Sequence, residues 1–318
     1  MIQSFLYKIR KHPFQFFLVK LLVLFVIIII LDQSIGYTLH HFYFKQQSGF
    51  QYRTTYSIEK TNAELLVFGS SRANHHYPPE IFENRLNMSF YNVGRDGNSI
   101  FYHSALLKGI LKRYTPKMII LDFDPYEFSL DQSSYDRLSA LLPYYKTHPE
   151  MRSIIEMKSP YEKIKLLSAI YPFNSGIFSI AAGNTEFNKK RMSDDKGYVA
   201  LHKVWNQPLK IDTNAFKFET DTNKIKLYEA FIQECIHAKI KLYIACSPFL
   251  LKSGFKAPFI TIGENIAAKY NIPFLDYSMN PVFADHSKLF EDLEHLNDTG
   301  AQLYCHMLLD SISKLPVN

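Results

Sequence analysis

The 318 residues leave room for one large domain or two smaller ones, and 47% apolar with 21% charged residues exclude a disordered or low-complexity chain. The formal charge of +6 is concentrated at the start: residues 1–20 hold four basic side chains and no acidic one, and removing those four from the 36 basic residues leaves 32 against 30 acidic ones. A body so close to neutral gives no electrostatic reason to expect nucleic acid as a partner.

The first expected element is a membrane anchor. Residues 14–31 read FQFFLVKLLVLFVIIIIL, interrupted only by Gln15 and Lys20, and this approaches the ~20 residues that cross a hydrocarbon core. A cleavable signal peptide is the alternative, but no clear A-x-A site follows Leu31. We therefore expect a tail at 1–13, a transmembrane anchor at 14–37 and a linker at 38–60.

The basic residues before the anchor favour a cytoplasmic N-terminus. The chain is then a single-pass protein of the cytoplasmic membrane, and its C-terminal domain at 61–318 is extracytoplasmic (periplasmic). The aromatic and polar residues of the linker are expected to form an interfacial belt and a tether.

Short β-like apolar runs alternate with helix-period segments from residue 64 onward, which is typical of a parallel sheet covered by helices. The runs predict strands at 64–68, 89–93, 118–123, 241–246 and 273–277. We expect an α/β three-layer sandwich with a five-stranded parallel sheet. Residues from about 130 to 215 break the alternation and are expected as a helical or irregular insertion over the sheet.

Two segments show an apolar helical face that predicts core helices. One face is formed by Ile225, Tyr228, Ile232, Cys235 and Ile236. The other runs from Ala301 to Ile312, after a helix cap offered by residue 297, 298 or 299. The three cysteines, Cys235, Cys246 and Cys305, lack metal-ligand spacing and are expected to be core residues.

Ligands of such a sheet bind beyond the carboxyl ends of the strands, so the residues directly after each strand are the candidates for chemistry. Ser71 follows the first strand, Gly97 lies in the turn after the second, and Asp292-x-x-His295 follows the last. Together they offer what acyl transfer needs. Ser71 is the expected nucleophile, His295 its base and Asp292 the orienting carboxylate, while the N–H groups of Ser71 and Gly97 form an oxyanion hole.

The runs VFGSSRANHHYPP, YNVGRDGNS and FEDLEHLNDTGA resemble the SGNH (GDSL) hydrolase superfamily, particularly its membrane-anchored branch, similar to D-alanyl-lipoteichoic acid biosynthesis and alginate-type O-acetylation proteins. The resemblance spans roughly residues 62–129 and 216–314 and implies a flavodoxin-like fold. On it, Ser71 matches the nucleophile, Gly97 the oxyanion-hole glycine, and Asp292 and His295 the final catalytic block.

Two departures from the family pattern stand out. Ser70 occupies the position where the common motif has Asp. The block after the third strand reads LDFDPYEF and lacks the usual Gly-x-Asn, so the third oxyanion donor is missing from its usual place. Loss of one such donor typically costs ~10²–10³ in turnover.

Further side chains near the motifs are candidate substrate contacts, namely Arg72, His75, Asn98 and Asp124. Arg72 either clamps an anionic group or pairs with Asp96, and we favour the pairing. Of Asp122 and Asp124, both expected at the end of the sheet, Asp124 is expected to reach the cleft.

A metal site is not expected, and nothing in the sequence asks for a cofactor. His75 and His76 with His295 resemble a zinc ligand set, but neighbours on a helix point about 100° apart. At most one of the two adjacent histidines then faces the cleft, and the other is expected at the solvated surface.

The leading functional prediction is a membrane-anchored serine acyltransferase or esterase that acts on acyl groups, above all acetyl, of a cell-envelope glycan or acylated polymer. The resemblance implies a membrane-bound O-acyltransferase as a partner and favours transfer. The alternative is a non-catalytic envelope-assembly protein that keeps the fold and binds the polymer or that partner. A secreted carbohydrate esterase with a cleaved apolar segment is the third reading. Close approach of Ser71 Oγ to His295 separates the first hypothesis from the second.

Overall fold

The computed structural model describes residues 12–185, 194–207, 219–250, 257–284 and 286–316. The central parallel sheet has the order β2-β1-β3-β4-β5. Its strands are Leu65–Phe68 (β1), Phe90–Asn92 (β2), Met118–Asp122 (β3), Lys241–Cys246 (β4) and Phe274–Asp276 (β5). Each predicted strand is present, and this is the doubly wound order of flavodoxin-like folds.

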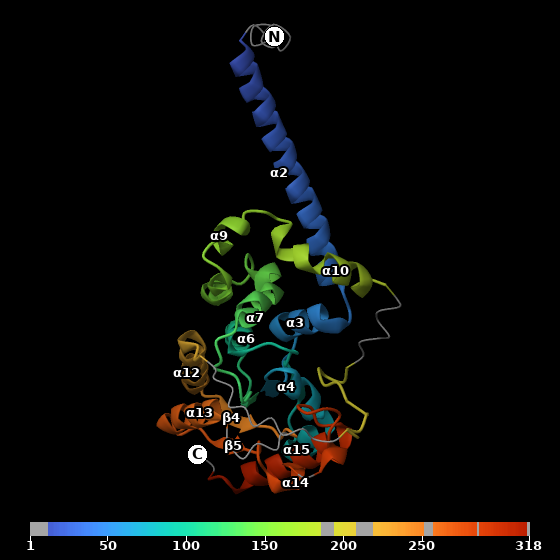
Figure 1. The fold of residues 1–318 in the computed structure, drawn as a ribbon, viewed down its shortest axis with the longest axis vertical. Helices are drawn as coiled ribbons and strands as arrows, with labels where there is room; N and C mark the ends of the chain where they lie inside the picture. The colour runs from blue at the N-terminus through green and yellow to red at the C-terminus, as the bar shows by residue number, and fades with distance from the viewer. Residues whose placement is uncertain (1–11, 186–193, 208–218, 251–256, 285, 317–318) are drawn as a thin grey trace.

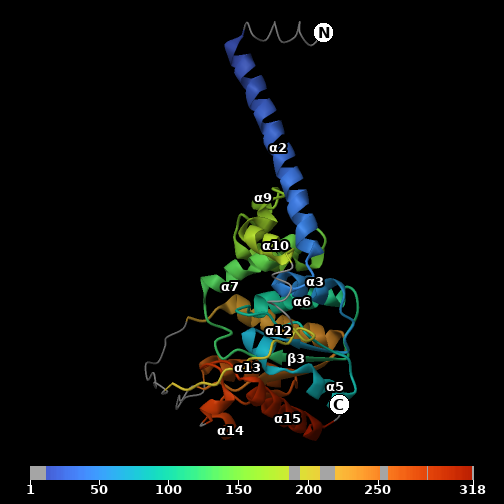
Figure 2. The same cartoon turned by 90° about the vertical axis from the view of Figure 1, so that its right-hand side faces the viewer.

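Helices cover both faces of the sheet, because alternate residues of each strand point to opposite sides. Leu66 and Phe68 pack with one cluster, and Leu65 and Val67 with the other. The first face is covered by α6 (Ile100–Leu111), α12 (Thr222–His237) and α13 (Pro258–Lys269), and the second by α4 (Ser71–His76), α5 (Pro79–Leu86) and α15 (Asp298–Lys314). The predicted three-layer α/β sandwich is confirmed (Figure 2).

The predicted helical faces are largely confirmed. In α12, Tyr228, Ile232 and Cys235 are buried, but Ile236 is 43% exposed and lies outside the face. The residues that α15 buries run from Gly300 to Ile312, and its cap is Asn297, whose Oδ1 accepts from the Gly300 N–H at 3.1 Å. All three cysteines are buried and free.

The N-terminal helix α2, Pro13–Lys45, has two different parts. An 18-residue window has a mean hydropathy of 3.0 with none of it buried, so the helix is long and apolar enough to cross a membrane. Its later part packs on the body: the Asp32 carboxylate accepts from the Ala169 N–H at 2.7 Å. A Cβ on Gly36 would be 2.4 Å from that of Ala169. Figure 1 shows the apolar part projecting alone.

Residues 38–60, expected as a linker and tether, are instead largely helical and packed. The helix α2 continues to Lys45, and α3 (Gly49–Glu59) packs on α6. Arg53 and Thr54 of α3 are buried. Arg53 donates to Asn74 Oδ1 at 2.6 Å, and Thr54 Oγ1 lies 2.9 Å from the Tyr102 hydroxyl. The buried polar residues of α3 are therefore internal hydrogen-bond partners, and the segment is not a solvated tether.

The predicted insertion divides into two parts. Residues 132–183, here called the cap, form short helices. These are α7 (Gln132–Asp136), η1 (Arg137–Tyr144), η2 (Pro149–Met151), α8 (Arg152–Ile155), η3 (Glu156–Lys158), α9 (Glu162–Lys165), η4 (Tyr171–Gly176) and α10 (Ile177–Gly183). The cap packs on α6 and α2 rather than directly on the sheet, at the end from which α2 projects (Figures 1 and 2).

Residues 194–205, the second part, run along the edge of the sheet where the strands end. The Val199 N–H donates to Asn74 O at 3.0 Å, and the Trp205 N–H donates to Phe290 O at 2.7 Å. Residues 186–193 and 208–215 of the predicted insertion lie outside the described parts of the chain. After β5 the chain forms α14 (Pro281–Ala284) and η5 (Ser287–Leu289) before it enters α15.

Candidate active site

Ser71 is the first residue of α4. It lies two residues after Gly69, the glycine that directly follows β1. Gly69 has a φ of +145°, a conformation that L residues rarely adopt. A Cβ at this position would lie 2.7 Å from the Cβ of Ala73 and 2.9 Å from Asp122 O. Only glycine fits a turn this tight, and the turn delivers Ser71 to the carboxyl edge of the sheet.

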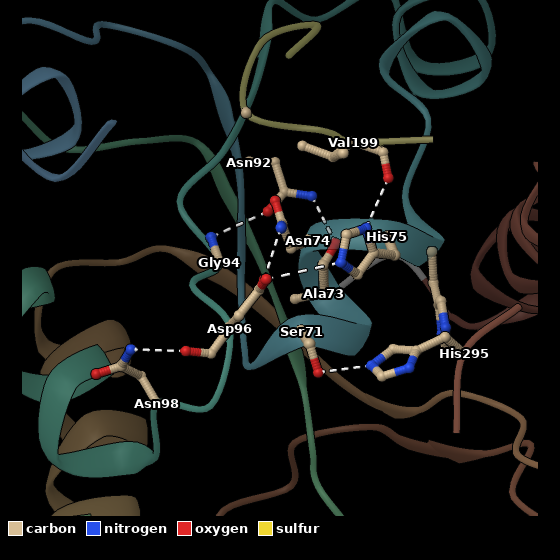
Figure 3. A network of polar contacts seen from close by, with 12 residues as sticks. Ser71, Ala73, Asn74, His75, Asn92, Gly94, Asp96, Asn98, Val199 and His295 are labelled. Carbon is tan, nitrogen blue, oxygen red and sulfur yellow. Dashed lines mark hydrogen bonds and ion pairs between the residues drawn. The ribbon is translucent and has the colours of Figure 1, made fainter. Parts of the chain in front are cut away.

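His295 comes from the segment before α15 and meets Ser71 across 224 positions of sequence. Its Nε2 is 2.7 Å from Ser71 Oγ, and its Nδ1 is 2.9 Å from both carboxylate oxygens of Asp292. With Asp292 ionised, Nδ1 carries the ring proton and Nε2 accepts from the Ser71 hydroxyl. Figure 3 shows the Ser71 hydroxyl pointing at the His295 ring. The three predicted catalytic side chains are thus brought together.

The Asp292 side chain is held by the backbone of the turn that follows it. Its Oδ1 accepts the Glu294 and His295 N–H groups, each at 2.8 Å. Burial by itself would raise the pKa of Asp292, but these donors and the His295 ring outweigh it, so the pKa lies below its ordinary value. Asp292 therefore stays ionised at neutral pH and can orient the imidazole.

The Asn92 side chain hydrogen-bonds the turn after β2 to α4, a role that was not predicted from the sequence. Its Oδ1 accepts the Gly94 N–H at 2.9 Å, and its Nδ2 donates to Ala73 O at 2.6 Å. The Arg95 N–H donates to Gly69 O at 3.0 Å. Gly97, at a φ of +67°, lies in this turn and is exposed. Asn92 opens the Asn-x-Gly-x-x-Gly run, and that was the available signal.

His76 is fully buried, which corrects the expectation that one of the adjacent histidines is solvated. Its Nε2 accepts the Leu296 N–H at 2.9 Å, and its Nδ1 donates to Ser247 Oγ at 2.9 Å. Burial, together with the nearby charge of Arg72, holds the pKa of His76 well below its usual range. A neutral His76 thereby fixes the backbone next to His295.

His75 lies beside His295. Its Nδ1 donates to Val199 O at 2.7 Å, its Nε2 is 3.8 Å from Asp96 Oδ1, and its ring centroid is 5.5 Å from that of His295. The carbonyl of Val199 thus holds the ring beside the site. A contact of His75 with substrate stays a prediction.

Arg72 does not pair with Asp96, which corrects the favoured pairing. Its Nη2 lies 3.2 Å from Asp122 Oδ1 and donates to Phe123 O at 3.0 Å. Because β3 lies beside β1, the end of β3 carries Asp122 under α4. Asp96 instead accepts from Asn74 Nδ2 at 2.6 Å. Arg72 is 3% exposed, so it supports the site from below rather than contacting substrate.

The other two candidate contacts lie on turns. Asn98 is 6% exposed and donates from Nδ2 to Asp96 O at 3.1 Å, while its buried Oδ1 has no hydrogen-bond partner within the described part of the chain. Asp124 is half-buried, and its Oδ1 accepts the Tyr126 N–H at 2.8 Å to hold the turn after β3. That turn carries no amide side chain where the family pattern has its oxyanion Asn.

The described residues contain no group of three or more His, Cys, Asp or Glu side chains placed to hold a metal ion. Although His75 and His76 both lie near His295, both ring nitrogens of His76 and of His295 take part in the hydrogen bonds given above. Metal binding here would break the contacts that build the site.

Replacing Gly69 by alanine should destabilise the protein by about 1–3 kcal/mol, because the new methyl group meets backbone and the positive φ is strained. Gly176→Ala is the matched control, since its φ is −111° and the nearest atom to a new Cβ is 3.6 Å away. Urea unfolding of both variants measures the difference. Equal midpoints would contradict the strained turn.

Glu127 predicts a pH dependence of stability. Its Oε1 accepts the Ile100 N–H at 2.7 Å, and burial raises its pKa from 4.5 to about 8. The folded protein therefore keeps a proton that the unfolded chain has lost, so this contribution to stability is complete below pH 4.5 and is lost as the pH rises towards 8.

Glu127→Gln removes the titration but keeps the shape and the acceptor. Unfolding midpoints in urea are measured at several pH values between 5 and 8. The stability of the variant relative to the wild type should increase as the pH rises. Parallel curves for the two proteins would show that Glu127 is ionised in the fold.

No family model and no curated protein matches this chain. Solved structures of other proteins are similar to it, among them the following three. A putative acylhydrolase from Bacteroides fragilis NCTC 9343 shares 11% identity over 85% of this chain and 98% of its own, with a TM-score of 0.41. An acetyl xylan esterase shares 14% over 78% and 99%, with a TM-score of 0.39. A GDSL-like lipase from Bacteroides thetaiotaomicron VPI-5482 shares 11% over 79% and 87%, with a TM-score of 0.37.

Proposed function

We propose that the chain is a membrane-anchored SGNH-type serine enzyme that transfers or hydrolyses acyl groups, above all acetyl, on a cell-envelope glycan or acylated polymer. The observation that carries the proposal is the continuous hydrogen-bonded row of Ser71, His295 and Asp292, with an Oγ–Nε2 distance of 2.7 Å. A hydroxyl becomes a useful nucleophile when a base within this range takes its proton.

The reaction follows from these positions. Ser71 Oγ attacks the acyl carbonyl while His295 Nε2 takes its proton, and the protonated ring then gives that proton to the leaving oxygen. An acyl-Ser71 ester remains. Water or a sugar hydroxyl attacks this ester in the second half while His295 takes its proton; the acyl–Oγ bond then breaks, and the ring returns the proton to Ser71 Oγ. Water as the acceptor makes the protein an esterase, and a sugar hydroxyl makes it a transferase.

Developing negative charge on the carbonyl oxygen is met by the N–H groups of Ser71 and Gly97. Over the described parts of the chain, neither group donates to a protein acceptor. Because the turn after β3 lacks the usual Asn, we expect turnover on simple esters to be slower by about 10²–10³ than with a complete oxyanion hole.

The packing of α2 supports an uncleaved anchor. Residues of this helix beyond the apolar stretch are part of the folded body: Tyr43 is 6% exposed and lies in the larger core cluster. Asp32 accepts N–H groups of the cap. Removal of the helix as a signal peptide would leave these sites unfilled. A membrane-bound O-acyltransferase remains the partner that would supply the acyl group from the other side of the membrane.

The proposal is tested by exposing the full-length protein in detergent micelles to a fluorophosphonate and measuring its intact mass. We expect one adduct, mapped to Ser71 and absent from Ser71→Ala. The matched control is Ser70→Ala, which removes the neighbouring hydroxyl. Because the Ser70 side chain makes no capping hydrogen bond, this variant should keep the adduct. An unmodified wild-type protein would contradict an activated Ser71.

Transfer and hydrolysis are separated by the fate of the acyl group. With p-nitrophenyl acetate as the donor and an oligosaccharide as the acceptor, mass spectrometry distinguishes acetylated sugar from free acetate. Acetylated sugar that exceeds the amount formed by Ser71→Ala would assign the protein as a transferase. Free acetate alone would assign it as an esterase.

The non-catalytic alternative is disfavoured by the contact of Ser71 with His295, because a protein that only binds has no need of an aligned base. It would become the better reading if Ser71 formed no adduct while the chain still bound polymer.

A further inference from the structure

A cavity of about 380 Å³ lies between the cap, the start of the body and the turn after β2. The cap contributes segments of η1, η4 and α10. The start of the body contributes Tyr43, Phe50 and Gln51, and the turn contributes Arg95, Asp96 and Asn98. None of the three catalytic side chains lines it, so it is a separate site beside the proposed active centre.

Two arginines on the cavity wall lack a carboxylate partner in the parts of the chain that the structure describes. Arg95 donates to Thr54 Oγ1 at 2.6 Å. The guanidinium of Arg137, from the cap, makes neither a hydrogen bond nor an ion pair within those parts, and a Cβ on Gly97 would be 2.3 Å from its Nη1. Its guanidinium therefore lies against the proposed oxyanion glycine. A guanidinium offers paired donors that match a carboxylate or a phosphate.

The acidic residue of the same wall does not cancel this charge. Asp96 directs its carboxylate at Asn74 and His75 and away from Asn98, as Figure 3 shows. Hydroxyl and amide side chains make up much of the remaining wall, with aromatic rings between them. They are Gln51, Asn98, Ser139, Ser175 and Ser179. The Oδ1 atom of Asn98 is buried and has no hydrogen-bond partner among the residues that the structure describes.

We infer that this cavity binds a sugar unit that carries an anionic group, a carboxylate or a phosphate, with Arg137 as the principal contact. The hydroxyl and amide groups would pair with sugar hydroxyls, and the aromatic rings would pack on the sugar face. This assignment rests on the proposed function, and it narrows the polymer of that function to an acidic one.

The turn of residues 95–98 connects the two sites. On one side Arg95, Asp96 and Asn98 line the cavity. On the other, the Arg95 N–H bonds Gly69 O, and the Asp96 carboxylate bonds Asn74 of α4, the helix that Ser71 begins. An acidic unit bound in the cavity would thus be separated from Ser71 by the turn of residues 95–98. This arrangement suits a polymer that extends across both sites.

Binding is measured with the full-length Ser71→Ala protein in detergent micelles, so that the result does not depend on turnover. The probes are an oligogalacturonate, a glycerol-phosphate oligomer and a neutral maltooligosaccharide of similar length. We expect one anionic oligomer to bind at least tenfold more tightly than the neutral one at low salt, and which one binds identifies the anionic group as carboxylate or phosphate. Equal binding of all three, or binding of none, would overturn the inference.

Variants locate the site. Arg137→Gln should weaken binding of the anionic oligomer by about 10- to 100-fold, the range typical of one charge-assisted hydrogen bond. Arg85→Gln is the matched control, because Arg85 pairs with Asp310 at 2.7 Å on the α5 and α15 side. Ser139→Asp should weaken binding relative to Ser139→Asn, which has the same shape without the charge. Unchanged affinity in Arg137→Gln and Ser139→Asp would overturn the assignment, whatever the fluorophosphonate reports for Ser71.

The cap also exposes large apolar side chains at its end nearest to α2. Phe178 is 91% exposed, Leu167 76%, Ile164 68% and Tyr161 65%. The segment after Leu167 bonds Asp32, directly beyond the apolar stretch of α2, and α10 packs on the same helix. Figures 1 and 2 both place α9 and α10 at the end of the body from which α2 projects.

We propose that this surface, defined by Tyr161, Ile164, Leu167 and Phe178, inserts into the lipid interface beside the anchor. Apolar side chains at the depth where the spanning helix leaves the hydrocarbon are stabilised there, and Lys163 on the same segment suits anionic headgroups. The inference rests on the proposed anchor. It fixes the height of the catalytic site above the membrane, because the cap packs on both α2 and α6.

The test uses the full chain in vesicles containing lipids brominated near the headgroup. In a Trp205→Phe background, Phe178→Trp should be quenched strongly, whereas Met279→Trp, an exposed position by α14 at the opposite end, should not. Protein that enters the vesicles with an unquenched Phe178→Trp overturns this inference alone. Protein that fails to enter them overturns the anchor as well.

Discussion

Replacing Ser71 by alanine is expected to lower kcat/KM for p-nitrophenyl acetate by roughly 10⁴-fold or more, because the attacking oxygen is lost. His295→Ala should lower it by a similar factor, since the hydroxyl 2.7 Å from Nε2 then keeps its proton. The two residues act as one unit, so the double variant should be no slower than either single one. Initial rates of the full-length protein, corrected for spontaneous hydrolysis, measure all three.

Asp292→Asn tests the orientation of the base. An asparagine oxygen can still accept the Glu294 and His295 N–H groups, so the turn is kept while the ionised partner of Nδ1 is lost. We expect a rate between those of the wild type and His295→Ala. If Ser71→Ala hydrolysed the ester as fast as the wild type, Ser71 would have no part in the reaction and the non-catalytic reading would replace it.

The fold and the row of Ser71, His295 and Asp292 could be predicted from the sequence because both follow from local signals. Buried parallel strands are short apolar runs between helical segments, and functional side chains of such sheets lie directly after the strands. Ser71 after β1 and His295 before α15 therefore meet once the strand order is known. Asp292 and His295 are three residues apart, and one turn of the backbone brings them into contact.

The roles of the supporting residues could not be predicted, because they depend on contacts between distant segments. His76 resembles a surface histidine until Ser247 and the Leu296 N–H are placed against it, at separations of 171 and 220 residues. The polar side chains of α3 resemble a tether until their partners in the turn after β2 and in α6 are known. Pattern alone does not distinguish an internal polar contact from a solvated one.

The pairing of Arg72 was misassigned for a similar reason, and it leads to the largest expected effect on stability. Asp96 is closer to Arg72 in sequence, but Asp122 lies under it in the sheet. Arg72 and Asp122 are 3% and 2% exposed, and Tyr77 donates to the second carboxylate oxygen at 2.5 Å. This is a buried charge pair whose remaining acceptor is also filled.

Asp122→Asn is therefore expected to destabilise the protein by about 3–5 kcal/mol, because the Arg72 charge stays buried without its partner. Urea unfolding followed by the fluorescence of Trp205, the single tryptophan, measures the loss. Asp310→Asn is the matched control: it breaks the Arg85 pair, whose side chains are 38% and 58% exposed, and should change little.

The double variant Arg72→Met with Asp122→Asn separates loss of charge pairing from loss of packing. If the unpaired charge is the cause, removal of Arg72 should recover part of the stability lost in Asp122→Asn. A double variant less stable than Asp122→Asn would mean that the packing and hydrogen bonds of Arg72, and not its charge, hold α4 on the sheet. The same measurement then decides whether Ser71 is positioned by electrostatics or by shape.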